Sequence, residues 1–413
     1  MVQIRPFKGI RPQEALVKEI ASHPYDVLNS QEAYTLAKNN PYSYLHIDKA
    51  EIDLPSDLSP YDSKVYAKAA ENLATFQSQG WLVQDAQPAF YLYELTMAGR
   101  SQTGLVTCTS IDDYLAGQIK KHEYTRVEKE LDRINHSDAC DANTSPIFLT
   151  YRQEPLIQEL IHSWKKTHQP LYDFKHYYEV THRVWLIDSQ ETIDALVAAF
   201  AEVPALYIAD GHHRTESAVK VGQKRRLAQP DYGPEAEFNY FLSVVFPKEE
   251  LAIWDYNRVL NLPLPEDLMA QLATAFTVTP VAEAAYQPQQ AGHFGMYLNQ
   301  EWFDLAIKAE FIPTDVVEKL DAALLQEHVF KKIFDIKDIR TDNRIDFVGG
   351  IRGIKELEDL VNHGDFTLAF SLYPTTMDQL LAVADENQVM PPKSTWFEPK
   401  LLSGLFLHDL ASQ

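Results

Sequence analysis

The chain has 413 residues, of which 45% are hydrophobic and 23% are charged, a mixture typical of soluble globular proteins. Lys and Arg total 37 against 59 Asp and Glu, which gives a formal net charge of −22. Such a chain repels nucleic acid and anionic membranes, so we expect neither as a partner, and any anionic ligand needs a local group of cations.

Taken in chain order, the patterns first predict short helices at residues 11–21 and 30–40, with the loop HPYDVLN between them. Apolar residues at helical spacing predict a helix over residues 61–79. Residues 88–97 and 103–111 are rich in aromatic and β-branched side chains, which predicts a β-hairpin.

The middle of the chain alternates helical and strand patterns, which predicts mixed α/β layers and an α+β fold. The expected elements are a helix at 154–166, a strand at 182–188, a helix at 189–203, a strand at 205–210, a helix at 215–227, and strands at 238–246 and 251–260. The last third predicts helices at 265–276, 316–334 and 377–387 and strands at 293–299 and 301–307. We expect an N-terminal α+β region over residues 1–250 and a C-terminal one over residues 251–413, unless they form one integrated unit.

The start of the chain, MVQIRPFKGIRP, has no apolar core and no small-residue cleavage pattern, so we expect no secretory signal. The most apolar stretch, residues 193–210, is interrupted by Glu202 and Pro204, so we expect no transmembrane segment. Cys108 and Cys140 lack zinc spacing and are expected to be reduced. These features predict a cytoplasmic protein.

The stretch YIADGHHRTESA, residues 207–218, joins an apolar strand to a charged helix start. A strand that ends at Asp210 and turns through Gly211 presents free backbone N–H groups where the helix begins. Those groups and the helix dipole attract anions, and His212, His213 and Arg214 strengthen the attraction. The turn therefore predicts a phosphate site in which Asp210 holds Mg²⁺ or accepts a proton.

Other interpretations of this stretch stay open. Asp210 alone can cap the helix, with Arg214 paired to Glu216 or another acid, although capping does not account for two His and an Arg in a row. Zinc is a further option, but adjacent His residues point in different directions and no His-Glu-x-x-His occurs. The chain contains neither Gly-x-Gly-x-x-Gly nor a Walker A loop, which disfavours a conventional dinucleotide enzyme or P-loop kinase.

Three further segments combine polar residues or glycines. The run at residues 118–148 contains His122 and Glu123; its composition favours a solvated helix with ion pairs, but a carboxylate such as Glu123 is also the group that takes a proton from an attacking hydroxyl. In MPPKSTWFEPK, the side chains of Lys393, Ser394 and Thr395 suit phosphate oxygens, unless the segment is only a rigid surface loop. The glycines of IDFVGGIRG, residues 345–353, either cradle an anion or only turn tightly.

Together these stretches resemble the family of domain of unknown function 1015 from bacteria and archaea. The resemblance runs in the family's order through nearly the whole chain, from RPFKGIRP and HPYDV through KKHEYT, NTSPIFLTY and YIADGHHRTESA to MPPKSTWFEPKLLSGLF. Two departures occur, because His23 replaces the first proline of the family's Pro-Pro-Tyr-Asp and the run RVEKELDR is altered. More remotely, the Asp-Gly-His-His-Arg turn resembles the phosphate-binding turn of the ParB and sulfiredoxin superfamily, which includes free-serine kinases.

This resemblance implies a ParB/sulfiredoxin-like core with an additional C-terminal α+β region. It implies that the catalytic residues are Glu123, Asp210, His213 and Arg214, with Glu123 as the base that activates the substrate hydroxyl. With the segments above, it places the nucleotide phosphates on Gly211, His212, His213, Arg214, Lys393, Ser394 and Thr395, the substrate on Tyr25, Asp26 and His122, and a metal on Asp210.

We therefore expect a small-molecule kinase that uses Mg²⁺ and a nucleotide such as ATP or ADP to phosphorylate the hydroxyl of a small metabolite, with free serine as the first candidate. One alternative is a metal-dependent phosphatase or nucleotide hydrolase. Another is a non-catalytic nucleotide-sensing or interaction protein. We also expect residues 23–26, Glu123, residues 210–214 and Lys393 to line one cleft.

Overall fold

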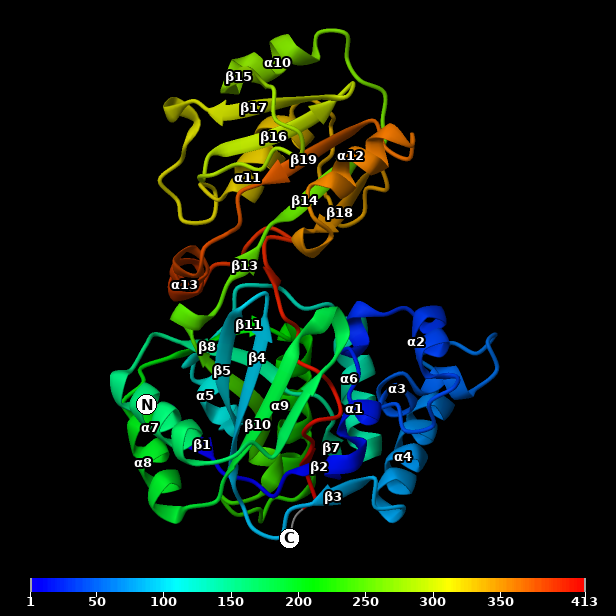
Figure 1. Cartoon of the computed structure of the whole chain (residues 1–413), viewed down its shortest axis with the longest axis vertical. Helices are drawn as coiled ribbons and strands as arrows, with labels where there is room; N and C mark the ends of the chain where they lie inside the picture. Colours follow the sequence, from blue (N-terminus) through cyan, green and yellow to red (C-terminus); the bar gives the residue numbers. More distant parts are fainter. Residues whose placement is uncertain (1, 412–413) are drawn as a thin grey trace. The chain divides into compact units, whose positions relative to one another are not determined.

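The computed structural model describes residues 2–411 and contains two compact units. The first unit comprises residues 1–251 and 399–413, and the second comprises residues 252–398. The last segment of the chain thus belongs to the first unit, although it follows the second in sequence. Each unit combines helices with β-sheets, which confirms the predicted mixed α/β class (Figure 1).

The first unit is built on a mixed nine-stranded sheet with the order β6-β11-β8-β12-β5-β4-β10-β9, and β1 pairs with β5. Its strands are β1 (Ile4–Arg5), β4 (Phe90–Met97), β5 (Arg100–Ser110), β6 (Ile119–Lys120), β8 (Ile147–Tyr151), β9 (Tyr172–Lys175), β10 (Thr181–Ile187), β11 (Leu206–Asp210) and β12 (Tyr240–Pro247). The predicted hairpin is present as β4 and β5, with Tyr91 opposite Val106 and Met97 opposite Arg100. β8 runs parallel to β12 and antiparallel to β11.

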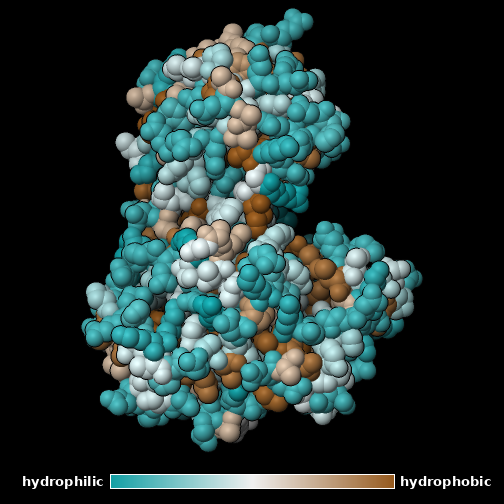
Figure 2. Space-filling view, in the orientation of Figure 1, coloured by the Kyte–Doolittle hydropathy of each residue, from teal (hydrophilic) through white to brown (hydrophobic). Residues whose placement is uncertain are grey.

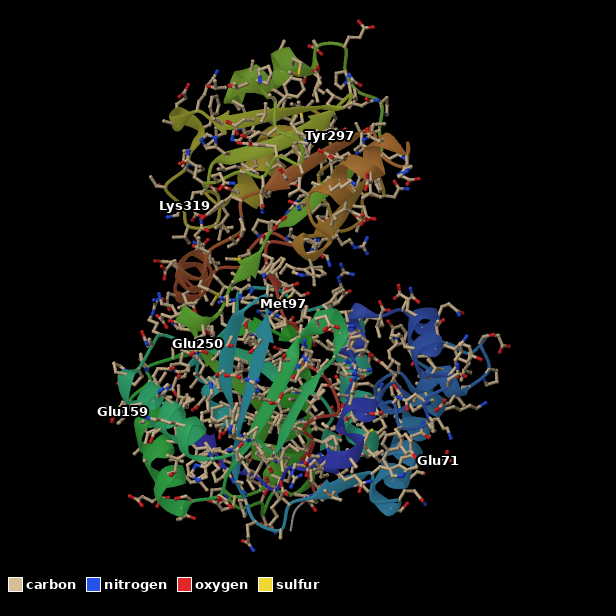
Figure 3. The ribbon with its side chains drawn as sticks, viewed as in Figure 1. Glu71, Met97, Glu159, Glu250, Tyr297 and Lys319 are labelled. Atoms are coloured by element: carbon tan, nitrogen blue, oxygen red, sulfur yellow. The ribbon has the colours of Figure 1, made fainter. Side chains whose placement is uncertain are left out.

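Helices surround this sheet. They are α1 (Val17–Ile20), α2 (Ser30–Ala37), α3 (Leu45–Asp48), α4 (Ser63–Ser78), α5 (Ile111–Leu115), α6 (Val127–Cys140), α7 (Pro155–Thr167), α8 (Gln190–Ala201) and α9 (His212–Ala228). α7 and α8 place Ile157 and Phe200 in one core with Leu92 and Leu149 of the sheet. Figure 3 shows Glu71 of α4 and Glu159 of α7 on the outside of this unit, and both are exposed, as expected for the polar faces of amphipathic helices.

In the first unit, one predicted helix is present nearly as expected and another is much shorter than expected. The helix predicted at residues 61–79 is confirmed as α4, and the carboxylate of Asp62 caps it by accepting from the N–H of Lys64. The helix predicted at residues 11–21 is reduced to α1. Residues Ile10–Pro12 form β2 instead, because they pair with β3 (Leu82–Gln84).

A second small sheet joins β7 (Ala142–Asn143) to β21 (His408–Asp409) and holds the last segment on this unit.

The second unit contains an antiparallel six-stranded sheet with the order β15-β17-β16-β19-β14-β18. Its strands are β14 (Tyr256–Leu260), β15 (Phe276–Val281), β16 (His293–Leu298), β17 (Glu301–Ile307), β18 (Ile345–Gly349) and β19 (Leu368–Leu372), and β13 (Ile253–Trp254) pairs separately with β20 (Trp396–Phe397). Its helices are α10 (Leu268–Ala275), α11 (Asp321–Leu325), α12 (Lys355–Asn362) and α13 (Met377–Asp385). The helix predicted at residues 316–334 begins only at Asp321 and continues from Gln326 as a π-helix.

The surface in view is mostly hydrophilic on both units (Figure 2), as expected from the large net charge. None of the helices within residues 2–411 combines the length and apolarity needed to cross a membrane.

Helix α9 carries the charged motif and is held closely against its neighbours. A Cβ atom added at Gly222 would lie 2.4 Å from the carbonyl oxygen of Phe238 and 2.7 Å from Cδ1 of Ile111. Glycine therefore lets this helix approach the backbone at residue 238. The same helix packs along α6, where the hydroxyl of Ser217 donates to the carbonyl oxygen of Glu130.

This packing predicts that Gly222→Ala destabilises the protein by about 1–3 kcal/mol, because the methyl group overlaps a backbone oxygen. In an open helix position the same change stabilises by about 1 kcal/mol. Gly233→Ala is the matched control, since a Cβ atom added at Gly233 would have no neighbouring atom within 4 Å. Urea unfolding measures both variants, and an unchanged or raised stability of Gly222→Ala would show that α9 is not held this closely.

Candidate functional site

The turn between β11 and α9 requires glycine. A β-bulge lies between Ile208 and Asp210, and Gly211 follows with φ 95° and ψ 34°, a left-handed conformation that glycine adopts without strain. A Cβ atom on Gly211 would also lie 3.1 Å from Nε of Arg214. The N–H of Gly211 donates to Oδ1 of Asp210 at 3.0 Å, so Asp210 braces the turn rather than capping α9.

The first backbone N–H groups of α9 are available to a ligand. No side chain caps this helix. The carbonyl oxygen of Gly211 accepts from the N–H and the hydroxyl of Thr215. Within residues 2–411, the N–H groups of His212, His213 and Arg214 donate no hydrogen bond. Free N–H groups at a helix start favour an anion.

Arg214 lies beside this helix start, and its guanidinium is buried. Its Nη1 donates to the carbonyl oxygen of Pro146 at 2.6 Å, and its Nη2 lies 3.6 Å from Asp26 and 3.8 Å from Asp210. Its Nε has no partner among the described residues. Burial opposes the charge, but Asp26 and Asp210 outweigh it and raise the pKa of Arg214. The surface pairing of Arg214 with Glu216 considered from the sequence is not formed.

Asp210 has a second cationic neighbour that the sequence did not point to. The ammonium of Lys400 lies 3.2 Å from Oδ2 of Asp210. Burial acts to raise the pKa of Asp210, but Lys400 and then Arg214 outweigh it and lower that pKa well below its usual value. Asp210 is therefore ionised at neutral pH.

The two histidines of the turn are neutral at pH 7. His212 is buried, its ring meets the ring of His122 edge-on at 4.4 Å, and its Nδ1 lies 3.7 Å from Glu123. Burial, and then His122, lower the pKa of His212 well below its usual value. Burial also lowers the pKa of His213, whose Nε2 accepts from the N–H of Arg126 at 3.0 Å. That bond leaves the proton on Nδ1 of His213, which makes this atom a hydrogen-bond donor.

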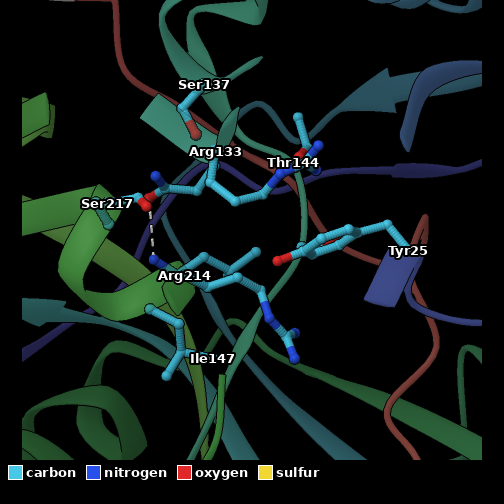
Figure 4. A pocket seen from close by; sticks show the side chains of 11 residues that line it. Tyr25, Arg133, Ser137, Thr144, Ile147, Arg214 and Ser217 are labelled. Carbon is cyan, nitrogen blue, oxygen red and sulfur yellow. Dashed lines mark hydrogen bonds between the residues drawn. The ribbon is translucent and has the colours of Figure 1, made fainter. Parts of the chain in front are cut away.

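A small pocket lies on the Arg214 side of α9 (Figure 4). It is lined by Arg214 together with Arg133, Tyr25, Ser137, Ser145 and Ser217. The pocket is narrow, with a cavity volume of about 20 Å³. A ligand larger than water therefore has to move side chains as it enters.

Arg133 shapes this pocket and was not singled out in the sequence. Its guanidinium lies 3.9 Å from the centre of the Tyr25 ring and is held by Asp132 at 2.8 Å and Asp48 at 3.8 Å. The composition of residues 118–148 predicts a solvated helix with ion pairs, but Asp132 and Arg133 are buried. The local sequence does not indicate this, because Asp48, Tyr25 and Tyr66, which contact the two side chains, come from elsewhere in the chain.

Most of the predicted site residues belong to the first unit. Asp26, Glu123 and residues 210–214 are connected by the contacts above, His122 adjoins His212, and Tyr25 lines the pocket. The ring of His23 instead stacks on the ring of Tyr177, with the ring centres 3.7 Å apart. The prediction that all these residues share one cleft stays a prediction.

The predicted phosphate ligands of the last loop belong to the second unit. Lys393 is exposed, with its ammonium 5.5 Å from the centre of the Tyr256 ring. The hydroxyl of Ser394 is buried and donates to the carbonyl oxygen of Pro391 at 2.7 Å. The role of Lys393, Ser394 and Thr395 toward phosphate stays a prediction.

The described residues do not provide a ready-made metal centre. No group of three or more His, Cys, Asp or Glu side chains within residues 2–411 is placed to hold a metal ion. Asp210 is the predicted ligand, but Lys400 and Arg214 already neutralise its charge. This donor set does not fit Mg²⁺ held by the protein itself.

The comparisons with known proteins identify a family. A family model described as protein of unknown function (DUF1015) matches residues 4–323. No curated protein gives a significant match to the sequence.

Several solved structures have a weak similarity to this chain. A mutant free serine kinase in complex with ADP has a TM-score of 0.38 and 12% identity, over 74% of this chain and 91% of that chain. A conserved hypothetical protein from Pyrococcus furiosus has a TM-score of 0.37 and 13% identity, over 73% and 95%. C-terminally truncated SbnI from Staphylococcus aureus has a TM-score of 0.36 and 10% identity, over 72% and 85%. At such low scores and identities, these likenesses assign no activity to this chain.

The buried histidines predict that the protein loses stability in mild acid. Burial lowers the pKa of His122 to about 4, and Asp210 opposes this shift only in part. In the unfolded chain a histidine has a pKa of about 6.5, so the unfolded state binds the proton first and stability falls as pH drops from about 6.5 toward 4. His122→Asn removes this contribution, and its stability should fall by about 2 kcal/mol less between pH 7 and pH 4.5.

Urea unfolding at the two pH values measures this difference. His162→Asn is the control, because His162 is exposed on α7 of the same unit, and it should keep the wild-type pH dependence. An identical pH dependence of His122→Asn and wild type would mean that folding does not lower the pKa of His122.

Proposed function

The chain belongs to the DUF1015 family of proteins of unknown function, and from its own site we propose that it is a nucleotide-dependent phosphotransferase that acts on a hydroxyl of a small metabolite. One observation carries the proposal. The N–H groups of His212, His213 and Arg214 and the side-chain Nε of Arg214 are all without partners among residues 2–411 at the turn where α9 begins. Several donors that converge on one turn match the oxygens of a phosphate group.

The cations of this turn remain able to bind an anion. Nη2 of Arg214 lies 3.6 and 3.8 Å from its two acids, which is longer than a direct charge-assisted hydrogen bond of about 2.7–2.9 Å. The guanidinium is therefore not locked by Asp26 and Asp210. Nδ1 of neutral His213 supplies a further donor. Because the pocket beside Arg214 is narrow, nucleotide binding has to widen it.

Glu123 is the proposed general base. Its side chain is 49% exposed, and its carboxylate lies 3.7 Å from Nδ1 of His212, so it is near the phosphate-binding donors and open to a second substrate. In the proposed reaction, Glu123 takes the proton of the acceptor hydroxyl, whose oxygen forms a bond to the terminal phosphorus of the nucleotide. The bond from that phosphorus to the bridging oxygen breaks, and the donors of the turn stabilise the charge of the leaving group.

Free serine is the proposed first acceptor, and comparison of phosphate release with and without serine separates transfer from hydrolysis. Release of phosphate from the nucleotide that is independent of any acceptor would identify a hydrolase. Tight nucleotide binding without turnover across a panel of hydroxyl compounds would identify a nucleotide-sensing protein. Mg²⁺ is expected only as the counter-ion that accompanies a nucleotide, since Lys400 and Arg214 already neutralise the charge of Asp210.

Arg214→Lys tests the phosphate site. The change keeps a positive charge between Asp26 and Asp210 but removes the planar fork and the Nε donor. In the wild type, ATP or ADP with Mg²⁺ should raise the melting temperature, because a ligand that binds only the folded state stabilises it. In Arg214→Lys this rise should largely disappear, and turnover should fall at least about tenfold.

Arg226→Lys is the matched control at the other end of α9, where Arg226 pairs with Asp112, and it should keep both properties. No stabilisation of the wild type by millimolar ATP, ADP or AMP would contradict the proposal. So would full nucleotide stabilisation and turnover in Arg214→Lys.

Glu123→Gln tests the base. We expect turnover to fall by about 10²–10⁴-fold, while the nucleotide-induced rise in melting temperature persists, because Glu123 is not assigned to the phosphates. Glu128→Gln is the control, since Glu128 is exposed on the neighbouring α6. Equal turnover in Glu123→Gln and Glu128→Gln would remove Glu123 from the mechanism.

A further inference from the structure

The second unit contains a larger pocket that the proposed phosphotransferase site does not use. Its cavity volume is about 310 Å³, and all of the residues that line it belong to the second unit. Apolar side chains of Ile253, Trp254, Ile354 and Pro374 form much of its wall. Its polar lining consists mainly of Asp255 and Gln287 with the backbone of the glycine turn at residues 350–353.

Asp255 is a buried carboxylate without a cation. It is 6% exposed, and the side chains within residues 2–411 that donate to its two oxygens are the neutral amides of Asn257 at 2.5 Å and Gln287 at 3.4 Å. No Lys, Arg or His within residues 2–411 forms an ion pair with it. Burying a carboxylate is costly unless a cation offsets its charge. In the first unit, by contrast, the buried acids Asp48 and Asp132 both lie beside Arg133.

The glycine turn packs against this carboxylate. A Cβ atom on Gly350 would lie 2.2 Å from Oδ1 of Asp255, and the N–H of Gly350 donates to the backbone oxygen of Asp255 at 2.8 Å. Gly350 of IDFVGGIRG therefore faces an acid. The neighbouring carboxylate disfavours an anion site at these glycines, which was one of the two interpretations of the sequence, and favours a ligand of positive charge.

We infer that this pocket binds a small organic ammonium ion, with the ammonium group paired to the carboxylate of Asp255 and the hydrocarbon part against Trp254 and Ile354. Burial, opposed by the hydrogen bond from Asn257, raises the pKa of Asp255, as expected for an acid whose counter-charge comes from outside the chain. The size of the pocket suits a ligand of metabolite size. The inference is independent of the proposed phosphotransferase activity, because every residue involved lies in the other unit.

Titration of the full chain with n-butylammonium chloride at pH 7.5 tests the inference, followed by calorimetry or by NMR of the indole N–H signals. We expect saturable binding with a dissociation constant of about millimolar or lower. n-Butanol has the same hydrocarbon part without the charge, and butyrate has the opposite charge. Both should bind at least about tenfold more weakly.

Asp255→Asn is the direct variant, because it removes the charge and nearly keeps the shape. It should weaken n-butylammonium binding at least about tenfold, whereas Asp365→Asn, a change at an exposed acid of the same unit, should leave binding unchanged. If Asp255→Asn does not fold, Ala252→Trp provides the second test, since it fills the pocket and leaves Asp255 in place.

Three results would overturn the inference: no saturable binding of n-butylammonium to the wild type, equal binding of n-butanol, or wild-type affinity in the folded variants. ATP-induced stabilisation, which tests the first unit, is measured on the same samples. The two measurements therefore distinguish a failure of the proposed ammonium site from a failure of the proposed phosphate site.

Discussion

The carboxylate of Asp210 is the contact on which the site of the first unit depends. It accepts from the N–H of Gly211, pairs with Lys400 and lies near Arg214. Asp210 ends a central strand, Arg214 belongs to the first turn of α9, and Lys400 comes from the segment that returns from the second unit. One partly buried carboxylate thus joins three parts of the chain. Since a partly buried charge that loses its partners is destabilising, the positions of these parts depend on one another.

Burial determines which side chains at the turn are charged and which are neutral. The side chains of His122 and His212 are almost completely buried, and their pKa values are lowered for that reason. Positive charge is left to Arg214 and Lys400, whereas the histidines contribute hydrogen bonds and shape. In the proposed function, the turn therefore binds an anion through oriented donors more than through net charge, since Asp26 and Asp210 balance the two cations. Such an arrangement discriminates by geometry, which suits a site that must position a phosphoryl group.

Buried acids beside the two pockets differ in how their negative charge is compensated. In the first unit, Arg133 lies beside both Asp132 and Asp48, so the charge around the narrow pocket is compensated from within the chain. In the second unit, Asp255 has only amide partners. A pocket whose acids are already paired has donors to offer to an anion, whereas one with an unpaired acid has a negative charge to offer to a cation. The same rule of charge compensation thus leads us to propose an anionic ligand for the first unit and a cationic ligand for the second.

The sequence by itself determined the local features of this protein, and only the tertiary structure decided which charges meet. Helix α4, the hairpin of β4 and β5, the turn through Gly211 and the relation to the DUF1015 family were predicted, because their signals come from residues that are adjacent in the chain. Lys400, however, lies 190 residues from Asp210 in sequence, and no periodicity relates them. The expected exposure of Asp132 and Arg133 was wrong because Asp48 and the Tyr25 ring, which lie beside Arg133, come from other elements. Local chain chemistry sets the shape of a turn, but burial and the pairing of distant charges set its electrostatics, and these exist only once the chain is folded.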